Sequence, residues 1–287
     1  YTSKSPDGDW KPKLLNLYEE LIEMVAESDE SLLETFFDKG ELSDEELKGG
    51  LKAAINNGLV PVFCCSGEKN VGAKRILEIL SKYGVVASDK EYKCKSNGNQ
   101  INIEYSDSNL SAVVFKTLSE EHVGELSFFR IYSGSLKSGD DIENGTRNLR
   151  EKLRQIYFVN GQKRKDASSI IAGDIGAALK LKGTHSGDTL RSVSGNKVEL
   201  ESITYPLPNM SFAIKPESRG DEDKMATGLS VAHEEDPTFL YGFDKETKQT
   251  IIQGQGELHI DLVLNKIKER FGVSLLKEKP KVPYRET

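Results

Sequence analysis

The chain has 287 residues and a mass of 31.9 kDa, a length typical of two or three domains. Hydrophobic residues make up 37% and charged residues 30%, which excludes collagen-like and disordered proteins. No apolar run approaches the ~18–20 residues that span a bilayer, so no membrane partner is predicted. The net charge of -7 argues against a general nucleic-acid binder, but the excess acid lies mostly in residues 1–83, and residues 106–205 are nearly balanced.

Cysteine usage indicates the redox compartment. The chain has three cysteines, Cys64, Cys65 and Cys94, an odd number, and no C-x-x-C spacing occurs among them. This excludes a disulfide framework and a zinc site, and it favours a reducing cytoplasm. The chain also begins at Tyr1 rather than Met and stops abruptly at Thr287, as a processed protein or an excised fragment would.

Residues 1–83 are predicted to be mainly helical, with one strand. Apolar residues recur at helical spacing up to Phe37, and Ser43–Glu46 is a capping box that begins a further helix. The apolar run Leu59–Cys64 is typical of a buried strand in a parallel sheet, and a turn then leads into a helix that ends near Tyr83. Because one strand cannot form a sheet, this segment is expected to be an incomplete α/β domain.

Residues 84–105 are predicted to be a connector, because they are rich in Ser, Lys and Asn, and an edge strand at 100–105 stays an open possibility. Residues 106–205 instead contain short strand-like runs at near-regular spacing, with Gly and Asp turns between them. The expected strands cover residues 112–115, 124–132, 152–158, 170–171, 175–181 and 198–203. This pattern predicts a small β-barrel.

Residues 206–287 show a third pattern. In chain order they predict a strand at 210–215, a helix at 221–235, strands at 239–243 and 249–253, a helix at 257–271 and a strand at 273–276. The order β-α-β-β-α-β is the split βαβ, or ferredoxin-like, pattern. The predicted fold class is therefore multidomain α+β, with a partial α/β segment, then a β-barrel, then a ferredoxin-like domain.

Three short motifs resemble chemical sites but depart from them at the residue that matters. The run Gly67–Lys74 nearly matches a phosphate loop, yet Ala73 stands where the lysine is needed, so an ordinary strand-to-helix turn is favoured. Gly254-Gln255-Gly256 indicates a tight turn before a helix rather than a dinucleotide site. His233–Asp236, placed before Pro237, indicates a helix C-terminus, and neither a metal site nor a catalytic residue is predicted.

Two basic runs stand in the barrel segment. They are Arg147, Arg150, Lys152 and Arg154, and then Lys163-Arg164-Lys165. A solvated strand and loop and a phosphate-contacting edge both account for such runs. Aromatic residues in an RNP-like pattern are absent, so single-strand readout is not supported from the sequence.

Several longer motifs, in one order along the chain, resemble bacterial elongation factor G. Those similar to its second domain are Phe115–Thr117, Val123–Gly139, Ala172–Ile175 and Ser186–Leu190. Those similar to its third domain are Glu234–Phe239 and Gly254–Ile260, and Pro280–Thr287 resembles the passage into its fourth domain. The segment Pro61–Gly72 resembles the end of the family's GTPase domain. The resemblance implies an internal fragment of a longer protein.

In this family a loop that reads S-A presents a backbone N–H to guanine. Ser66-Gly67 occupies that loop here, so the resemblance implies that these residues contact the guanine of GTP or GDP. The sequence has no complete phosphate loop and no N-K-x-D, since Asn196–Glu199 lies in the barrel segment and has Glu for Asp. The parent protein is therefore expected to use GTP with Mg²⁺, whereas this fragment is expected to bind neither and to be inactive as a GTPase.

The resemblance also assigns the segments. Residues 1–83 would be the end of the GTPase domain with its helical insertion, 84–105 the connector, 106–205 domain II and 206–287 domain III. The implied function is that of a cytoplasmic, ribosome-dependent translational GTPase that translocates tRNA and mRNA, with ribosomal RNA and proteins as partners and the fragment monomeric. A ribosomal-protection protein of the same superfamily and a ribosome-binding module without GTPase activity are the alternatives.

Overall fold

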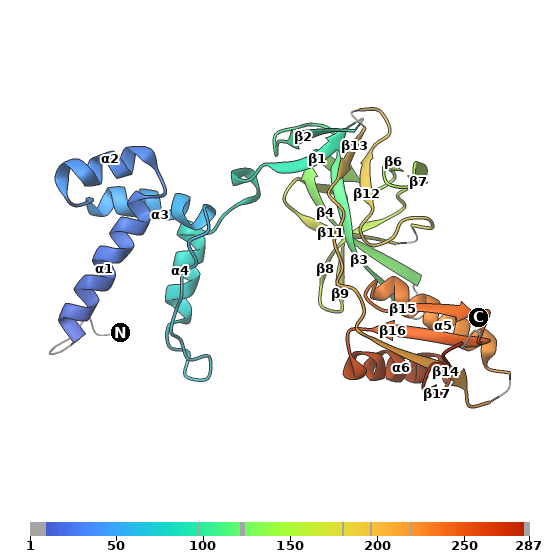
Figure 1. Ribbon diagram of the computed structural model, residues 1–287. Helices are drawn as coiled ribbons and strands as arrows, with labels where there is room; N and C mark the ends of the chain where they lie inside the picture. The colour runs from blue at the N-terminus through green and yellow to red at the C-terminus, as the bar shows by residue number, and fades with distance from the viewer. Residues whose placement is uncertain are drawn as a thin grey trace, which may run out of the picture. The chain divides into compact units, whose positions relative to one another are not determined.

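The computed structural model describes residues 10–283 except 97, 121–123, 180, 196 and 219. Val123, Asn196 and Tyr284–Thr287, which belong to motifs named above, lie outside the described residues. The chain divides into two compact units, residues 1–89 and 90–287 (Figure 1). Among the described helices, none combines the length and the apolar character that crossing a bilayer requires.

The first unit is helical. Its elements are α1 (Trp10–Ala26), α2 (Glu30–Lys39), α3 (Asp44–Asn56), α4 (Ala73–Tyr83) and a single 3₁₀ turn (Ala87–Asp89). The predicted capping box is present, because Ser43 Oγ accepts the N–H of Glu46 and the Glu46 carboxylate accepts the N–H of Ser43 at 2.8 Å. Ile22, Val25 and Ala54 lie at the centre of its apolar core.

The predicted strand at Leu59–Cys64 is wrong. The segment has no strand pairing, and the side chains of Val60 and Val62 are 77% and 87% exposed. An isolated extended segment cannot pair its backbone groups or bury both of its faces, and the described part of this unit contains no strand beside it. The apolar run therefore has the composition of a strand, but a strand forms only where a neighbouring strand is present.

The second unit begins with strands that form a barrel. Their bounds are β1 (Tyr92–Ser96), β2 (Asn99–Ile103), β3 (Ser111–Glu120), β4 (Gly124–Ser133), β5 (Ser135–Lys137), β6 (Asp141–Asn144), β7 (Leu149–Lys152), β8 (Ile156–Asn160), β9 (Lys163–Ala167), β10 (Ser169–Ile171), β11 (Ile175–Leu179), β12 (Thr189–Ser192) and β13 (Val198–Leu200). Eight of them form one antiparallel sheet in the order β7-β6-β12-β3-β4-β11-β8-β9, and β5 pairs with β10. Phe129, Ile131 and Ile156 are fully buried in the core.

Two expectations for this region change. The predicted connector contains the hairpin β1–β2, which joins β13 in a three-stranded sheet with β2 at its edge, so the open possibility of an edge strand is realised at Asn99–Ile103. The single strand predicted at 152–158 is two strands, because β7 pairs with β6 and β8 pairs with β9. Leu153 between them is fully buried, which explains why the apolar pattern runs through the break.

The ferredoxin-like prediction for the last segment is confirmed. The elements are β14 (Met210–Pro216), α5 (Glu222–Glu235), β15 (Leu240–Asp244), β16 (Gln249–Gly254), α6 (Glu257–Phe271) and β17 (Leu275–Glu278). The sheet is antiparallel in the order β15-β16-β14-β17, so the first and third strands of the domain lie at its centre. Leu229 of α5 and Ile260 of α6 are buried against Ile214 and Ile252 of the sheet.

Candidate functional site

The end of α5 carries three consecutive carboxylates, Glu234, Glu235 and Asp236. A helix C-terminus is the negative end of the helix dipole, so acidic residues are unfavourable there unless cations or N–H donors face them. The helix ends at Glu235, as the sequence predicts, and Pro237 cannot continue it. Each of the three carboxylates has a different partner, so no paired-carboxylate site forms.

Asp236 binds within its own domain. Its Oδ1 accepts the N–H and the hydroxyl of Thr238 at 3.0 and 2.6 Å, and its Oδ2 lies 3.0 Å from His259 Nε2. His259 Nδ1 accepts the N–H of Gln255 at 3.0 Å, which assigns the ring hydrogen to Nε2. Burial raises the pKa of Asp236, but hydrogen bonds from Thr238 and His259 outweigh burial and hold this pKa below its ordinary value.

Glu235 joins the ferredoxin-like domain to the barrel. Its Oε1 accepts the N–H of Ser119, on β3, and Nη1 of Arg270, on α6, both at 2.9 Å. Arg270 Nη2 in turn donates to the carbonyl of Ser119. The side chains of Glu235 and Arg270 are 22% and 27% exposed, so partial burial limits screening by water. We call Ser119, Glu235 and Arg270 the β3 clamp.

Glu234 makes a second link between the same two domains. Its Oε2 lies 2.6 Å from Nδ1 of His185, in the loop between β11 and β12. Asp188, only 3% exposed, holds this loop, because its Oδ2 accepts the N–H of His185, Nε of Arg147 and Nδ2 of Asn144, each at 2.8 Å. The Ser186–Leu190 motif therefore positions His185 toward α5.

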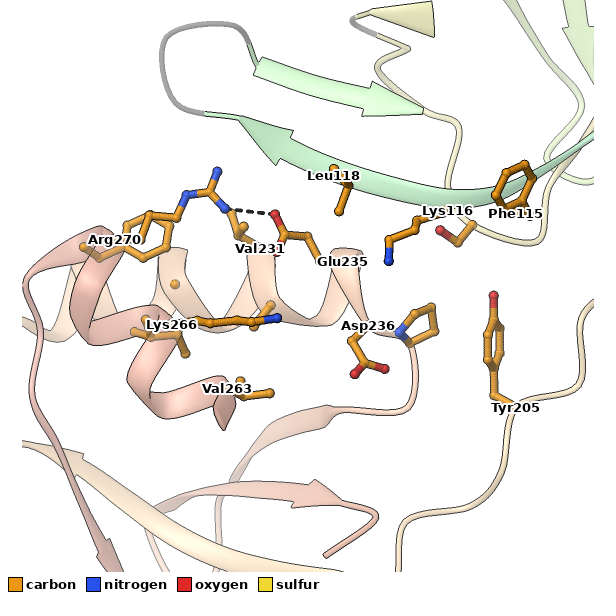
Figure 2. Close-up of a pocket in the computed structure, with 16 residues that line it drawn as sticks. Phe115, Lys116, Leu118, Tyr205, Val231, Glu235, Asp236, Val263, Lys266 and Arg270 are labelled. Atoms are coloured by element: carbon orange, nitrogen blue, oxygen red, sulfur yellow. Dashed lines mark hydrogen bonds and ion pairs between the residues drawn. The ribbon is translucent and has the colours of Figure 1, made fainter. Parts of the chain in front are cut away.

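A cavity of about 390 Å³ lies beside the β3 clamp, between β3, α5, α6 and Tyr205. Figure 2 shows the hydroxyl of Tyr205 pointing toward β3, and the ammonium groups of Lys116 and Lys266 pointing into the space between the two domains. The Tyr205 hydroxyl is buried and has no hydrogen-bond partner among the described residues, and burial raises the pKa of this hydroxyl. Phe115, the extra residue of a β-bulge in β3, also lines the cavity, and the bulge turns it out of the regular pleat.

The chemistry of this junction is that of a domain connection. Its contacts join carboxylates to a guanidinium, imidazoles and backbone N–H groups. Among the described residues, Ser186, which lines the cavity, makes no hydrogen bond to a histidine or a carboxylate, so these residues do not assemble a nucleophile with its general base there. Within the described parts of the chain, no group of three or more acidic, His or Cys side chains has the arrangement of a metal site.

The sequence-predicted residues Ser66 and Gly67 lie in the first unit, in the turn before α4. Ser66 and Val71 exchange backbone hydrogen bonds at 2.9 and 3.0 Å, and Ser66 Oγ accepts the N–H of Lys69 at 3.3 Å. Gly67 is exposed, its N–H has no partner among the described residues, and a Cβ added to it would meet nothing within 4 Å. Either Gly or Ala therefore fits this position.

The phosphate-loop near-match is a turn that leads into a helix, as predicted, but an unpaired segment and not a strand precedes it. The turn closes at Gly72, whose φ of 86° lies in the left-handed region, and α4 begins at Ala73. Lys74 is 93% exposed and pairs with Glu78 one turn along the same helix, at 4.0 Å. This geometry is that of an ordinary turn into a helix.

The sequence did not identify Ser119, Arg270, His185 and Tyr205 as site residues. One available signal was the run of carboxylates at a helix C-terminus, because the helix dipole disfavours them and they therefore require external partners. The identity of those partners follows only from the fold, since Ser119 and Arg270 are 151 positions apart in the chain.

Comparisons with protein families match both domains of the second unit. The model described as Elongation factor G domain 2 matches residues 109–193, and the model described as Elongation Factor G, domain III matches residues 205–278. Together these matches cover more than half of the chain, and the β3 clamp joins one matched region to the other.

A solved structure is similar to nearly the whole chain. The crystal structure of a protein from Thermus thermophilus matches with a TM-score of 0.80 and 26% sequence identity. The match covers 98% of this chain but only 40% of the Thermus thermophilus chain, so the present chain spans well under half the length of that protein.

Proposed function

Because the chain belongs to the elongation factor G family and carries that family's domains 2 and III, we propose that it acts within a ribosome-dependent translational GTPase that promotes the translocation of tRNA and mRNA. The observation that carries this proposal is the presence of both domain types in family order, in one chain and in direct contact. On this proposal the ribosome, through its RNA and proteins, is the partner, and the protein acts in the cytoplasm.

The proposed role of the second unit is to relay a domain movement. Two links, Glu235 with Ser119 and Arg270, and Glu234 with His185, fasten the ferredoxin-like domain to the barrel at separate points. Two links between the barrel and the ferredoxin-like domain restrict their relative rotation more than a single link does. A displacement of the barrel would therefore carry the ferredoxin-like domain with it. Such rigid-body coupling is a common way to pass a nucleotide-dependent change to distant domains.

The proposed nucleotide is GTP or GDP, with Mg²⁺ held by parts of the protein that carry a phosphate loop. In this chain Ser66 and Gly67 would contribute a guanine contact. Two features support this role, because the Gly67 N–H is exposed and has no partner among the described residues, and the Ser66–Val71 bridge holds the turn that presents it. When bound, the nucleotide would supply the phosphoryl chemistry, whereas this turn would only orient the base.

The test uses the complete protein encoded by the gene that contains this chain. GTP hydrolysis is measured with and without ribosomes, and movement of tRNA and mRNA is followed in a translocation assay. The proposal expects ribosome-stimulated hydrolysis together with translocation. Stimulated hydrolysis without translocation contradicts the translocase assignment and favours the ribosomal-protection alternative, and a complete protein that binds no guanine nucleotide contradicts the GTPase assignment altogether.

A second measurement uses the 287-residue chain alone. Because it lacks the phosphate cradle, we expect calorimetry to detect no binding of GTP, with or without Mg²⁺. Binding in the micromolar range would refute the argument that phosphate contacts outside this chain supply most of the nucleotide affinity.

A further inference from the structure

Asp188 joins three segments of the barrel through a single carboxylate oxygen. The side chain is 3% exposed, and its Oδ2 accepts Nδ2 of Asn144 at the end of β6, Nε of Arg147 in the turn after β6, and the N–H of His185 in the loop before β12, each at 2.8 Å. Hydrogen bonds to a carboxylate are roughly twice as strong as those between neutral groups. The guanidinium of Arg147 also balances the buried charge, which allows a carboxylate to lie inside the barrel.

Asp188 is itself held firmly in the barrel. Its carbonyl accepts the N–H of Val114, on β3, at 2.9 Å, and the N–H of Gly187 donates to the carbonyl of Val114 at 2.6 Å. The N–H of Asp188 donates to the carbonyl of His185 at 3.1 Å, which closes a turn over residues 185–188. The carboxylate therefore acts from a fixed base on the residue that begins this turn.

The ring of His185 depends on this turn for its position. Among the described residues, the only hydrogen bond of the ring is the contact of Nδ1 with Glu234 Oε2 at 2.6 Å, so no hydrogen bond within the barrel holds the ring. The earlier part of the loop is fastened separately, because Glu151 of β7 accepts three hydrogen bonds from residues 182–184. These contacts end one residue before His185. The placement of the ring therefore depends on the hydrogen bond from the His185 N–H to Asp188.

We propose that Asp188 is the positioning residue of the second link between the domains, and that it sets the strength of the His185–Glu234 contact from inside the barrel. None of the hydrogen bonds described for its side chain reaches the ferredoxin-like domain, so its influence on α5 would pass through His185. The inference rests on the proposed relay function and deepens it, because a contact that relays movement must be held rigidly on both sides. A carboxylate that served only the barrel would affect α5 no more than it affects the barrel itself.

The test measures hydrogen exchange by mass spectrometry on the whole 287-residue chain, with peptides from the end of α5 as the readout and peptides from β3 and β4 as the monitor of the barrel. Asp188→Asn keeps the shape of the side chain and removes its charge. His185→Ala removes the ring that pairs with Glu234 and leaves the backbone N–H in place. Glu143→Gln is the matched control, because Glu143 of β6 is also a barrel carboxylate paired with an arginine, Arg191, at 2.5 Å.

We expect His185→Ala to speed exchange at the end of α5 about fivefold, which corresponds to the net loss of one hydrogen bond. Asp188→Asn should speed this exchange about threefold to fivefold, because neutral hydrogen bonds hold the turn less firmly. The double variant Asp188→Asn/His185→Ala should exchange within about twofold of His185→Ala, whereas independent effects would multiply to about 15-fold to 25-fold. Glu143→Gln should leave exchange at α5 unchanged, both alone and together with His185→Ala.

Four results would overturn the inference. They are unchanged exchange at α5 in Asp188→Asn, an Asp188→Asn effect that persists in the His185→Ala background, an acceleration as large in β3 and β4 as in α5, and an equal acceleration at α5 in Glu143→Gln. If Asp188→Asn does not fold, Arg147→Gln takes its place, because it removes one donor to Asp188 at a side chain that is 46% exposed. Its effect on α5 must likewise vanish in the His185→Ala background.

The outcome is separable from that of the proposed function. Ribosome-stimulated GTP hydrolysis and translocation by the complete protein would stand even if Asp188 and His185 act independently. Coupling between these two residues would stand even if the complete protein translocates nothing.

Discussion

Gly254, the last residue of β16, lies where the sheet meets the start of α6. A Cβ added at this position would lie 2.9 Å from both His259 Nδ1 and Ile260 Cγ1, closer than real Cβ contacts. Neither neighbour is free to move, because His259 is hydrogen-bonded through both ring nitrogens and Ile260 is fully buried. The variant Gly254→Ala must therefore displace the first turn of α6 or the His259 ring.

The cost has two parts. Forcing one methyl group into a packed site costs about 1–3 kcal/mol. Displacing the ring also weakens the hydrogen bond from the Gln255 N–H to His259, worth about 1 kcal/mol. Together these effects lower the free energy of opening α6 by about 2–4 kcal/mol, which corresponds to about 30-fold to 700-fold faster amide exchange.

The assay is hydrogen exchange measured by mass spectrometry on peptides from α6. Gly242→Ala in β15 is the matched control, because a Cβ there meets nothing within 4 Å and the residue is exposed in the same sheet. We expect the control to be neutral or slightly protective, since Ala restricts the unfolded chain. If Gly254→Ala exchanges no faster than Gly242→Ala, the packing argument for the first glycine of the motif is refuted.

Three further changes test other parts of the structure. Glu235→Gln should lower the free energy of unfolding by about 1–3 kcal/mol, because Arg270 loses its anionic partner while partly buried. The double variant Glu235→Gln/Arg270→Gln should recover part of that loss, and calorimetry measures both variants. Asp236→Asn should remove a stabilisation that the wild-type protein shows above about pH 4 and loses as pH falls through the lowered folded-state pKa. Urea unfolding from pH 7 to pH 2.5 checks this sign, because the difference between the two proteins should narrow as pH falls, and a difference that widens contradicts it. Ser43→Ala should destabilise α3 by about 1 kcal/mol in urea unfolding, and an unchanged midpoint would contradict the observed capping box.

Elements whose signals are local were predictable from the sequence. The capping box at Ser43 depends on residues three positions apart, and the buried stripe of α6, including Ile260 and Ile267, follows the helical period. The ferredoxin-like order was predictable for the same reason, because each of its elements is long enough to show its own period. Two of its strands, β15 and β17, begin one and two residues later than predicted, within the usual uncertainty of element ends.

Elements that depend on partners were not predictable. The apolar run Leu59–Cys64 has the composition of a strand, but strand formation requires a neighbour, and the described part of its unit supplies none. The strands β5, β6, β9 and β12 have three to five residues and few apolar positions, so their alternation is too short to read. They become strands because neighbouring strands pair with them.

The motif glycines illustrate the same distinction within a site. The sequence treats Gly254 and Gly256 alike, as parts of one tight turn. In the structure only Gly254 is required by packing, whereas Gly256 has an extended φ of 174° and open space around its Cα. A turn motif therefore indicates where the backbone bends, but only the packing of His259 and Ile260 shows which glycine tolerates no side chain.

The carboxylates at the end of α5 couple the stability of this helix end to the contact between the two domains of the second unit. Alone, Glu234 and Glu235 would face the negative end of their own helix dipole and repel each other, which favours fraying of the last turn. Docking against the barrel supplies the Ser119 N–H and His185, and α6 supplies Arg270. The last turn of α5 is therefore most stable when the domains are joined, so helix formation and domain contact reinforce each other. Loss of one link would weaken the last turn of α5, and that turn also carries the carboxylate of the second link. The two links therefore stabilise each other, which makes the junction cooperative.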